Sequence, residues 1–243
     1  MKNTVIIIPS RLSATRLPNK PIRKILNVEM IVHVFRRAQE SELGDVFVAT
    51  PDKEIIKVVE KNGGKAILTE KKHLNGTSRV FEALLKLKNK NIDLIINLQG
   101  DMPNIKPSSI SKLEKFMRSS NSNIGTLASF IKDKHELTNP NIVKVKVDEE
   151  LENDRFLEAK DFFRIKKDTQ NEKIYHHIGI YAFTRDALSK YVKLPRSKLE
   201  LERNLEQMRA MENQLTIKVG LSQSIPLSVD TEKDLQEVER EMN

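Results

Sequence analysis

The chain has 243 residues, with 42 Lys and Arg against 34 Asp and Glu, a formal net charge of +8 and no cysteine. This length can bury a sizeable core, either as one domain or as one domain that carries a smaller subdomain. The lack of cysteine excludes a disulfide framework, thiolate metal sites and cysteine nucleophiles. A metal ion would therefore be held by oxygen or imidazole ligands, and oxygen ligands favour magnesium.

The positive charge favours an anionic partner, and a nucleic acid is the first to consider. The basic residues are spread among the acidic ones, tryptophan is absent and aromatic residues make up 5% of the chain, so we expect no nucleic-acid partner. A lysine-rich solvated surface is the alternative explanation of the charge. No run approaches the roughly 18 apolar residues of a membrane span, and no secretory signal pattern is present. We therefore expect no membrane span and a cytoplasmic location.

In the first hundred residues, short β-branched runs alternate with amphipathic stretches. This alternation predicts βα units, and right-handed crossovers then make neighbouring strands parallel. Continuously apolar strands suit a sheet that is covered on both faces. We expect an α/β fold with a doubly wound, mostly parallel sheet. The predicted strands are residues 5–8, 45–50, 65–69 and 93–98, and the predicted helices are residues 28–38, 54–59 and 80–87.

The second half of the chain is less regular. We expect it to remain part of a single domain over residues 1–243, with a smaller subdomain at approximately residues 130–200. The segment 166–173 has the composition of an exposed loop. The predicted strands are residues 142–147, 178–183 and 216–221, and the predicted helices are residues 187–192, 198–213 and 232–242.

The connection from residue 9 to residue 28 is long for a βα unit, and such length is usually functional. It carries three cations, Arg11, Arg16 and Lys20, beyond the carboxyl end of the first strand, where open α/β sheets bind their ligands. A triphosphate suits guanidinium forks and a lysine point charge. Three solvated surface charges are the alternative. Neither GxxxxGK[ST] nor GxGxxG is present, so side chains would hold the phosphates.

A carboxylate, Asp101, follows the apolar strand at residues 93–98 and the glycine at position 100. It is expected at the same sheet edge as the cations, where a carboxylate beside a triphosphate would suit magnesium. A turn aspartate that bonds its own backbone is the alternative. A second candidate ligand, Asp230, opens the final predicted helix, and there an ordinary helix N-cap is the competing interpretation.

Six motifs, in this order along nearly the whole chain, resemble those of the CMP-Kdo synthetases (3-deoxy-manno-octulosonate cytidylyltransferases). They are IIIPSRLSATRLPNKP at 6–21, HLNGTSR at 73–79, NLQGDMP at 97–103, YHHIGIYAF at 175–183, NLEQMRAMEN at 204–213 and SVDTEKDL at 228–235. The resemblance implies a fold of the nucleotide-diphospho-sugar transferase type. It also implies transfer of CMP from CTP to 3-deoxy-D-manno-octulosonate (Kdo) for lipopolysaccharide synthesis, with Mg²⁺ as cofactor, and a homodimer built largely from the second-half subdomain.

The resemblance also implies roles for individual residues. The implied catalytic residues are Arg11, Lys20, Asp101 and Asp230, with Asp101 and Asp230 as the magnesium ligands. The implied CTP contacts are Arg11, Arg16, Lys20 and Arg79 for the phosphates and Asn75, Gly76 and Thr77 for the nucleoside. The implied sugar-acid contacts are Gln99, His177, Tyr181, Glu206 and Gln207.

The chain departs from the family pattern at several positions. Asn19 stands where the family usually has glycine, Ser78 where it has an acidic residue, and Val28 and Glu29 where it has Gly and Lys. Residues 156–160 read FLEAK, whereas the family has an arginine in the third place and then a Pro, Trp pair. Two alternatives therefore stay open: CMP activation of another acidic sugar, of the sialic-acid type or an amino-modified Kdo, and a catalytically silent nucleotide-binding module.

Overall fold

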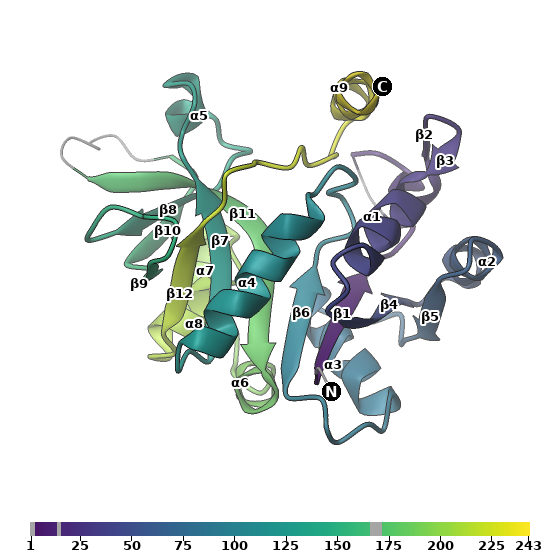
Figure 1. Ribbon diagram of the computed structural model, residues 1–243, viewed down its shortest axis with the longest axis horizontal. Coiled ribbons are helices and arrows are strands. Elements are labelled where there is room, and N and C mark those ends of the chain that lie inside the picture. The colour runs from purple at the N-terminus through teal and green to yellow at the C-terminus, as the bar shows by residue number, and fades with distance from the viewer. Residues whose placement is uncertain (1–2, 14–15, 166–171) are drawn as a thin grey trace. The chain divides into compact units, whose positions relative to one another are not determined.

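A computed structural model describes residues 3–13, 16–165 and 172–243 (Figure 1). The chain divides into two compact units, one made of Met1–Ser111 with Pro226–Asn243 and the other of Lys112–Ile225. Of the loop expected at residues 166–173, residues 166–171 lie outside the described part, and Lys173 begins a strand. Each unit is described below by itself.

The strands of the first unit form a parallel sheet in the order β5-β4-β1-β6. All residues of β1 and β6 are buried, which explains why their sequences are mostly apolar. These strands confirm the parallel α/β arrangement predicted for the first half. Their bounds are β1 (Thr4–Pro9), β4 (Gly44–Thr50), β5 (Lys65–Leu68) and β6 (Leu94–Leu98).

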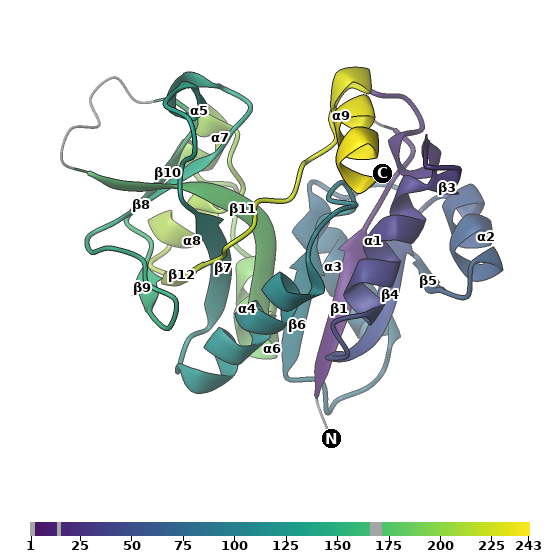
Figure 2. The same ribbon diagram turned by 45° about the horizontal axis from the view of Figure 1, so that its top comes forward.

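The helices between these strands cover both faces of the sheet. The connections from β1 to β4 and from β4 to β5 move in one direction across the sheet, and the connection from β5 to β6 moves back. Because such connections are right-handed, α3 lies on the face opposite to α1 and α2 (Figures 1 and 2). The doubly wound arrangement is thereby confirmed. The helices are α1 (Met30–Gln39), α2 (Lys53–Lys61), α3 (Gly76–Lys86) and the C-terminal α9 (Glu232–Met242).

The predicted start of the first helix at residue 28 is wrong by two residues. Residues 28 and 29 form β3 (Val28–Glu29), which pairs antiparallel with β2 (Lys24–Ile25). Leu26 and Asn27, at φ 48° and 65°, form the two-residue turn between them, because a type I′ hairpin needs positive φ at both central positions. Before this hairpin lies the single 3-10 turn η1 (Lys20–Ile22).

The strands of the second unit form a mixed arrangement. β12 pairs with β7 in parallel, whereas β11 pairs antiparallel with both β7 and β8. β9 pairs antiparallel with β12, and β10 with β8. The bounds are β7 (Ile124–Ser129), β8 (Lys144–Val147), β9 (Phe156–Glu158), β10 (Asp161–Phe163), β11 (Lys173–Thr184) and β12 (Ile217–Leu221).

Helices of the second unit are mostly short. The single helix predicted for residues 198–213 is wrong, because Asn204 at φ 51° ends α7 in a left-handed conformation and a second helix follows. The pattern also missed β7, whose buried residues include Thr126 and Ser129. The helices are α4 (Pro107–Ser119), which begins in the first unit, α5 (His135–Thr138), α6 (Arg185–Tyr191), α7 (Lys198–Arg203) and α8 (Met208–Glu212).

In the part of the chain that the structure describes, no helix has both the length and the apolar character needed to cross a membrane.

Candidate functional site

The candidate site is built at the carboxyl edge of the first unit's sheet. β1 ends at Pro9 and its parallel neighbour β6 ends at Leu98, so the segments that follow both strands emerge at the same edge. The segment before α9 joins them, because the Val229 amide donates to the Asp101 carbonyl at 2.9 Å. Three segments far apart in sequence thereby meet.

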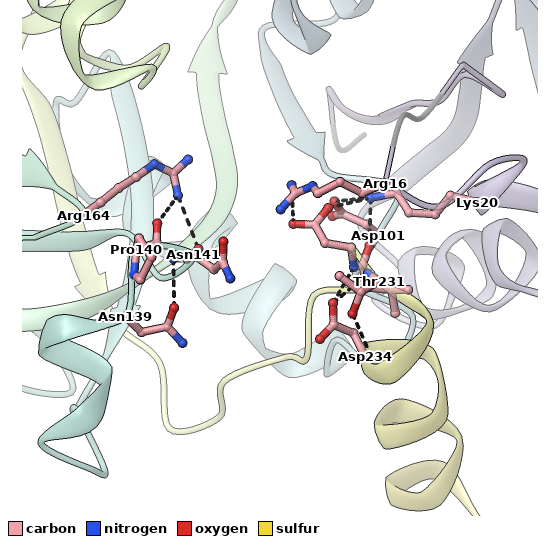
Figure 3. A network of polar contacts seen from close by, with 11 residues as sticks. Arg16, Lys20, Asp101, Asn139, Pro140, Asn141, Arg164, Thr231 and Asp234 are labelled. Atoms are coloured by element: carbon pink, nitrogen blue, oxygen red, sulfur yellow. Dashed lines mark hydrogen bonds and ion pairs between the residues drawn. The ribbon is translucent and has the colours of Figure 1, made fainter.

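Lys20 lies at the centre of this meeting point (Figure 3). Its Nζ is 3.1 Å from Asp101 Oδ2 and 3.2 Å from Asp230 Oδ1, and it donates to the Val229 carbonyl at 2.8 Å. The preceding Asn19 adopts φ 56°, ψ 26°. Asparagine tolerates this left-handed conformation, which explains how it replaces the glycine expected there.

The charges around Lys20 keep it protonated. Burial alone lowers the pKa of Lys20, but the attraction of Asp101 and Asp230 outweighs burial and raises the pKa above its ordinary value. Arg16 adds a second cation, with its Nη2 2.9 Å from Asp230 Oδ2. Two carboxylates and two cations therefore share one polar cluster.

Asp230 does not cap the final helix. Thr231 is the N-cap of α9: its side chain accepts from the Asp234 amide at 3.3 Å, and the Asp234 carboxylate accepts from the Thr231 amide at 2.8 Å (Figure 3). This is a capping box, which satisfies the first turn without Asp230. The N-cap interpretation of Asp230 is wrong, and its carboxylate is left to face Lys20 and Arg16.

Contacts along α9 fix the loop that carries the cations. Arg23 Nη2 lies 2.6 Å from Glu232 Oε1, and the Leu26 amide donates to Glu239 Oε1 at 2.9 Å. Beneath these polar contacts a cluster of buried apolar residues joins the loop, α1 and α9. Its members are Leu17, Ile25, Met30, Val229, Leu235 and Val238. The C-terminal helix thus holds Asp230 opposite Lys20 through packing and polar contacts together.

The donor set of this cluster fits magnesium. Asp101 and Asp230 supply hard oxygen ligands, and both reach the same Lys20 nitrogen, so the two carboxylates face a common point. Magnesium is usually bound by one or two protein carboxylates together with phosphate oxygens and water. Within the described ranges no group of three or more His, Asp or Glu residues is arranged for a metal ion. A site here would therefore depend on these two carboxylates and on the substrate.

Arg11 and Arg79 form a second pair of cations. Arg11 is exposed, whereas Arg79 on α3 is 3% exposed and its Nη1 donates to the Glu70 carbonyl at 2.9 Å. Burial lowers the pKa of Arg79, and the positive charge of Arg11 lowers it further. The two guanidiniums are therefore close enough to interact, which suits a shared anionic ligand.

The N-terminus of α3 carries the residues expected near the nucleoside. Asn75 caps it by accepting from the Ser78 amide at 2.9 Å. Ser78 Oγ donates to the Asn75 carbonyl and contacts His73 Nδ1 at 3.1 Å. Ser78, which departs from the family pattern, therefore fixes the loop that leads into α3. A Cβ added at Gly76 would lie 3.2 Å from Pro9 Cγ. The absence of a side chain lets α3 approach the end of β1 closely.

The residues expected at the sugar acid are divided between the units. Gln99 belongs to the first unit, whereas His177 and Tyr181 lie on β11 and Glu206 and Gln207 precede α8, all in the second unit. The His177 and Tyr181 rings are 5.4 Å apart. Burial raises the pKa of Tyr181, and the Glu206 carboxylate raises it further. The structure therefore brings these three residues of the second unit together, with Gln207 next to Glu206 in sequence.

Hydrogen bonds assign the tautomer of His177. Thr126 Oγ1 donates to the Ile180 carbonyl at 2.7 Å, so it accepts from His177 Nε2 at 3.0 Å. The proton is then on Nε2, and Nδ1 is an acceptor. Burial, with a smaller contribution from His176, lowers the pKa of His177 to about 3. His177 is therefore a neutral hydrogen-bonding group at neutral pH.

Tyr181 presents an unsatisfied group. Its hydroxyl is buried and has no hydrogen-bond partner among the residues that the structure describes. Buried hydroxyls are rarely left without a partner, so this one points to a bound ligand.

The altered segment at residues 156–160 makes local contacts. Phe156 stacks on Phe116 with ring centroids 5.1 Å apart. Glu158 Oε1 lies 3.3 Å from Lys160 Nζ, which is also 3.4 Å from Asp148 Oδ2. A carboxylate paired with a lysine thus stands where the family pattern has an arginine.

The sequence interpretation missed Asn97. This residue is fully buried on β6, and its side chain contacts both Thr77 and Gln99. The available signal was an amide inside an otherwise apolar strand, LIINL.

Comparisons with known proteins agree with this geometry. The profile of the cytidylyltransferase family matches residues 5–217. A 3-deoxy-manno-octulosonate cytidylyltransferase of Rhodopseudomonas palustris is 43% identical over 98% of this chain and 96% of that protein. One of Brucella canis is 43% identical over 96% of this chain and 92% of its own length.

A solved structure extends the likeness to three dimensions. It is a CMP:2-keto-3-deoxy-manno-octonic acid synthetase complexed with CTP, 35% identical to this chain, with a TM-score of 0.88 and coverage of 98% of both chains. The family profile, the near full-length relatives and this structure agree, and the chain therefore belongs to the cytidylyltransferase family, among the 3-deoxy-manno-octulosonate cytidylyltransferases.

Proposed function

We propose that the protein transfers CMP from CTP to Kdo, forming CMP-Kdo, the activated sugar used in lipopolysaccharide synthesis, and pyrophosphate. The observation that carries this proposal is the cluster in which Lys20 contacts both Asp101 and Asp230 at the carboxyl edge of the parallel sheet. Relatives that match almost the whole chain bear the name of this activity.

In the proposed reaction, the anomeric hydroxyl oxygen of the sugar acid attacks the α-phosphorus of CTP and loses its proton to solvent. The bond from that phosphorus to the bridging oxygen of the β-phosphate breaks, and pyrophosphate leaves with the bonding electron pair. Arg11, Arg16 and Lys20 are proposed to bind this leaving group, with Arg79 near Arg11. Nucleotidyl transfer depends mainly on positioning and on neutralising charge. Because the pKa of Lys20 is raised, Lys20 acts as a cation and not as a base.

Asp101 and Asp230 are proposed to hold Mg²⁺. When bound, this ion would neutralise phosphate charge and lower the pKa of a coordinated hydroxyl. Lys20, whose Nζ contacts both carboxylates, and Arg16, which contacts Asp230, balance their charge when no substrate is present.

The sugar acid is proposed to contact Gln99, His177, Tyr181, Glu206 and Gln207. His177 offers its Nδ1 lone pair to a sugar hydroxyl, and its pKa of about 3 makes it a poor general base. The Tyr181 hydroxyl, which has no partner among the described residues, would complete its hydrogen bonding on this ligand. His177 is thus proposed to orient the sugar and not to remove its proton.

The deciding experiment measures pyrophosphate release from CTP and Mg²⁺ with a panel of acids: Kdo, 8-amino-Kdo and N-acetylneuraminate. We expect Kdo to give the highest kcat/KM. Preference for the amino sugar would instead support the second candidate, CMP activation of an amino-modified acid, which Glu158 favours because a carboxylate stands where the family has an arginine. If none of the three acids gave pyrophosphate release, both candidates would be contradicted and a silent nucleotide-binding module would be supported.

Two further properties belong to the proposal. The protein is proposed to work in the cytoplasm, where CTP is made, and cell fractionation would test this. It is also proposed to form a homodimer through the second unit, since symmetric pairs are the commonest closed assembly. Light scattering at micromolar concentration should give the mass of two chains, and a mass of one chain would contradict this.

A further inference from the structure

Three side chains of the first unit form a continuous hydrogen-bonded chain behind the proposed substrate contacts. Asn97 Nδ2 donates to Thr77 Oγ1 at 3.1 Å, and Gln99 Nε2 donates to Asn97 Oδ1 at 3.1 Å. Asn97 is fully buried and Thr77 is 4% exposed, whereas Gln99 is partly exposed. Because buried polar groups need partners, both ends of the Asn97 amide are fixed by its two neighbours.

The direction of these bonds determines what Thr77 and Gln99 can offer to a ligand. Thr77 Oγ1 is the acceptor toward Asn97, so its proton points away and Thr77 can donate. Gln99 uses its amide nitrogen toward Asn97, so its carbonyl oxygen is left to accept. That oxygen lies 3.6 Å from the position of a Cβ added at Gly76, at the N-terminus of α3.

None of these three side chains can reverse the direction of its hydrogen bonding without the other two. If the Asn97 amide alone turned over, its nitrogen would face the Gln99 nitrogen and two donors would meet. A reversal of Asn97 therefore requires Gln99 to turn as well and Thr77 to donate inward. In that reversed arrangement Gln99 would offer a donor and Thr77 only lone pairs. The donor and acceptor character of the two outer groups is thus coupled through one buried amide.

We propose that Asn97 is a positioning residue that couples the nucleotide contact of Thr77 to the sugar contact of Gln99. In the observed direction, Thr77 donates to an acceptor of the pyrimidine nucleoside, such as a ring carbonyl oxygen. At the same time Gln99 accepts from a hydroxyl of the sugar acid. Correct binding of the nucleotide thereby selects the orientation of Gln99 that binds the sugar. This inference rests on the proposed function.

The first test uses Thr77→Val, which keeps the size of the side chain and removes the hydroxyl, with Thr77→Ser as the matched control. Loss of the Thr77 oxygen releases one end of Asn97, so the effect should reach Gln99. At saturating CTP we expect the KM for the sugar acid to rise about three- to tenfold in Thr77→Val, the range given by one ordinary hydrogen bond, and to rise less in Thr77→Ser, which keeps the hydroxyl.

The second test uses Asn97→Asp, which keeps an oxygen for Gln99 but replaces the donor toward Thr77. We expect a higher KM for CTP, because Thr77 must then donate inward to the aspartate, and a KM for the sugar acid near the wild-type value, because Gln99 keeps its acceptor. A purely structural role would lower stability and leave the KM for CTP unchanged as well. The double variant Thr77→Val/Asn97→Asp should raise the KM for CTP by less than the product of the single effects, because both changes remove the same outward donor of Thr77. Thermal melts show which variants remain folded.

The proposal is overturned if Thr77→Val raises the KM for CTP but leaves the KM for the sugar acid unchanged at saturating CTP. This result decides the matter even if Asn97→Asp does not fold, because Thr77→Val introduces no buried charge. Fully multiplicative effects in the double variant would also overturn it.

A third measurement separates this inference from the proposed function. In ¹⁵N spectra of the wild-type protein without substrate, the Gln99 side-chain amide signals, assigned by their loss in Gln99→Leu, should shift in Thr77→Val and not in Thr77→Ser. Unchanged signals would overturn the coupling. Shifted signals together with no turnover on any sugar acid would refute the proposed function alone.

Discussion

Lys20 Nζ lies 3.2 Å from Asp230 Oδ1, although 210 positions separate the two residues in sequence. The same nitrogen is 3.1 Å from Asp101 Oδ2. A partly buried ammonium flanked by two carboxylates is costly to disrupt, because removing one charge leaves the others without compensation. Substitutions can test the cation, the two carboxylates and the helix that follows Asp230 one at a time.

Replacing Lys20 by methionine removes the charge and keeps much of the side-chain length. We expect Lys20→Met to lower kcat at saturating CTP by about a hundredfold or more, since loss of one preorganised charge at a developing anion costs this much in other enzymes. Lys24→Met is the control, because Lys24 is exposed on β2. Pyrophosphate release at fixed Mg²⁺ is the measurement, and unchanged turnover in Lys20→Met would exclude Lys20 from the transition state.

Asp101→Asn and Asp230→Asn should each abolish most activity and raise the Mg²⁺ concentration needed for half-maximal rate. The reason is that a neutral amide binds magnesium more weakly than a carboxylate does. Asp45→Asn is a suitable control, since Asp45 forms an exposed ion pair with Lys65 at the start of β4. A magnesium titration of the rate gives both parameters. If either site variant kept the wild-type magnesium dependence, its residue would not be a ligand.

The contact between Glu239 and the hairpin should support CTP binding from a distance. Leu26 has φ 48°, an unfavourable value for leucine, and its amide is held by Glu239 Oε1. Glu239→Leu should loosen the loop that carries Lys20 and raise the KM for CTP about three- to tenfold, the worth of one hydrogen bond. Glu239→Gln, which retains an acceptor, should restore the wild-type value.

Glu237→Leu serves as the control for that experiment, because Glu237 is exposed on the same helix. An equal rise in KM for Glu237→Leu and Glu239→Leu would mean that the general charge of α9, and not the contact with Leu26, controls CTP binding.

His177 should make the stability of the protein depend on pH. The pKa of His177 is about 3 in the folded protein and 6.5 for an ordinary histidine. Between these pH values the histidine is protonated in the unfolded chain and neutral in the folded protein. Its contribution to the free energy of unfolding is therefore complete above pH 6.5 and falls by up to about 1.4 kcal/mol per pH unit below it. Urea unfolding between pH 5 and 7.5 should show a shallower dependence in His177→Gln.

The exposed His135 provides the comparison, and His135→Gln should keep the wild-type dependence. A His177→Gln protein whose unfolding free energy falls as steeply with acid as that of the wild type would show that His177 can be protonated in the folded state.

The sequence by itself determined the elements whose signals are local. The apolar run at residues 5–8 became the buried strand β1, and α9 has the predicted bounds because Thr231 and Asp234 form a capping box beside an amphipathic stretch. The motifs indicated the family and the candidate residues. They could not show that Asn204 would break a predicted helix, because a left-handed residue inside an amphipathic stretch leaves the periodicity almost intact.

Only the tertiary structure decided which distant residues meet. Asp230 could have capped α9 on local grounds, but packing of α9 on the loop before α1 turns its carboxylate toward Lys20. In the sequence, Asn97 is one polar residue in an apolar strand, and only the packing of α3 shows that its side chain contacts Thr77. Local propensity and periodicity depend on near neighbours in the chain, whereas these contacts arise from strand order and helix packing between segments far apart in sequence.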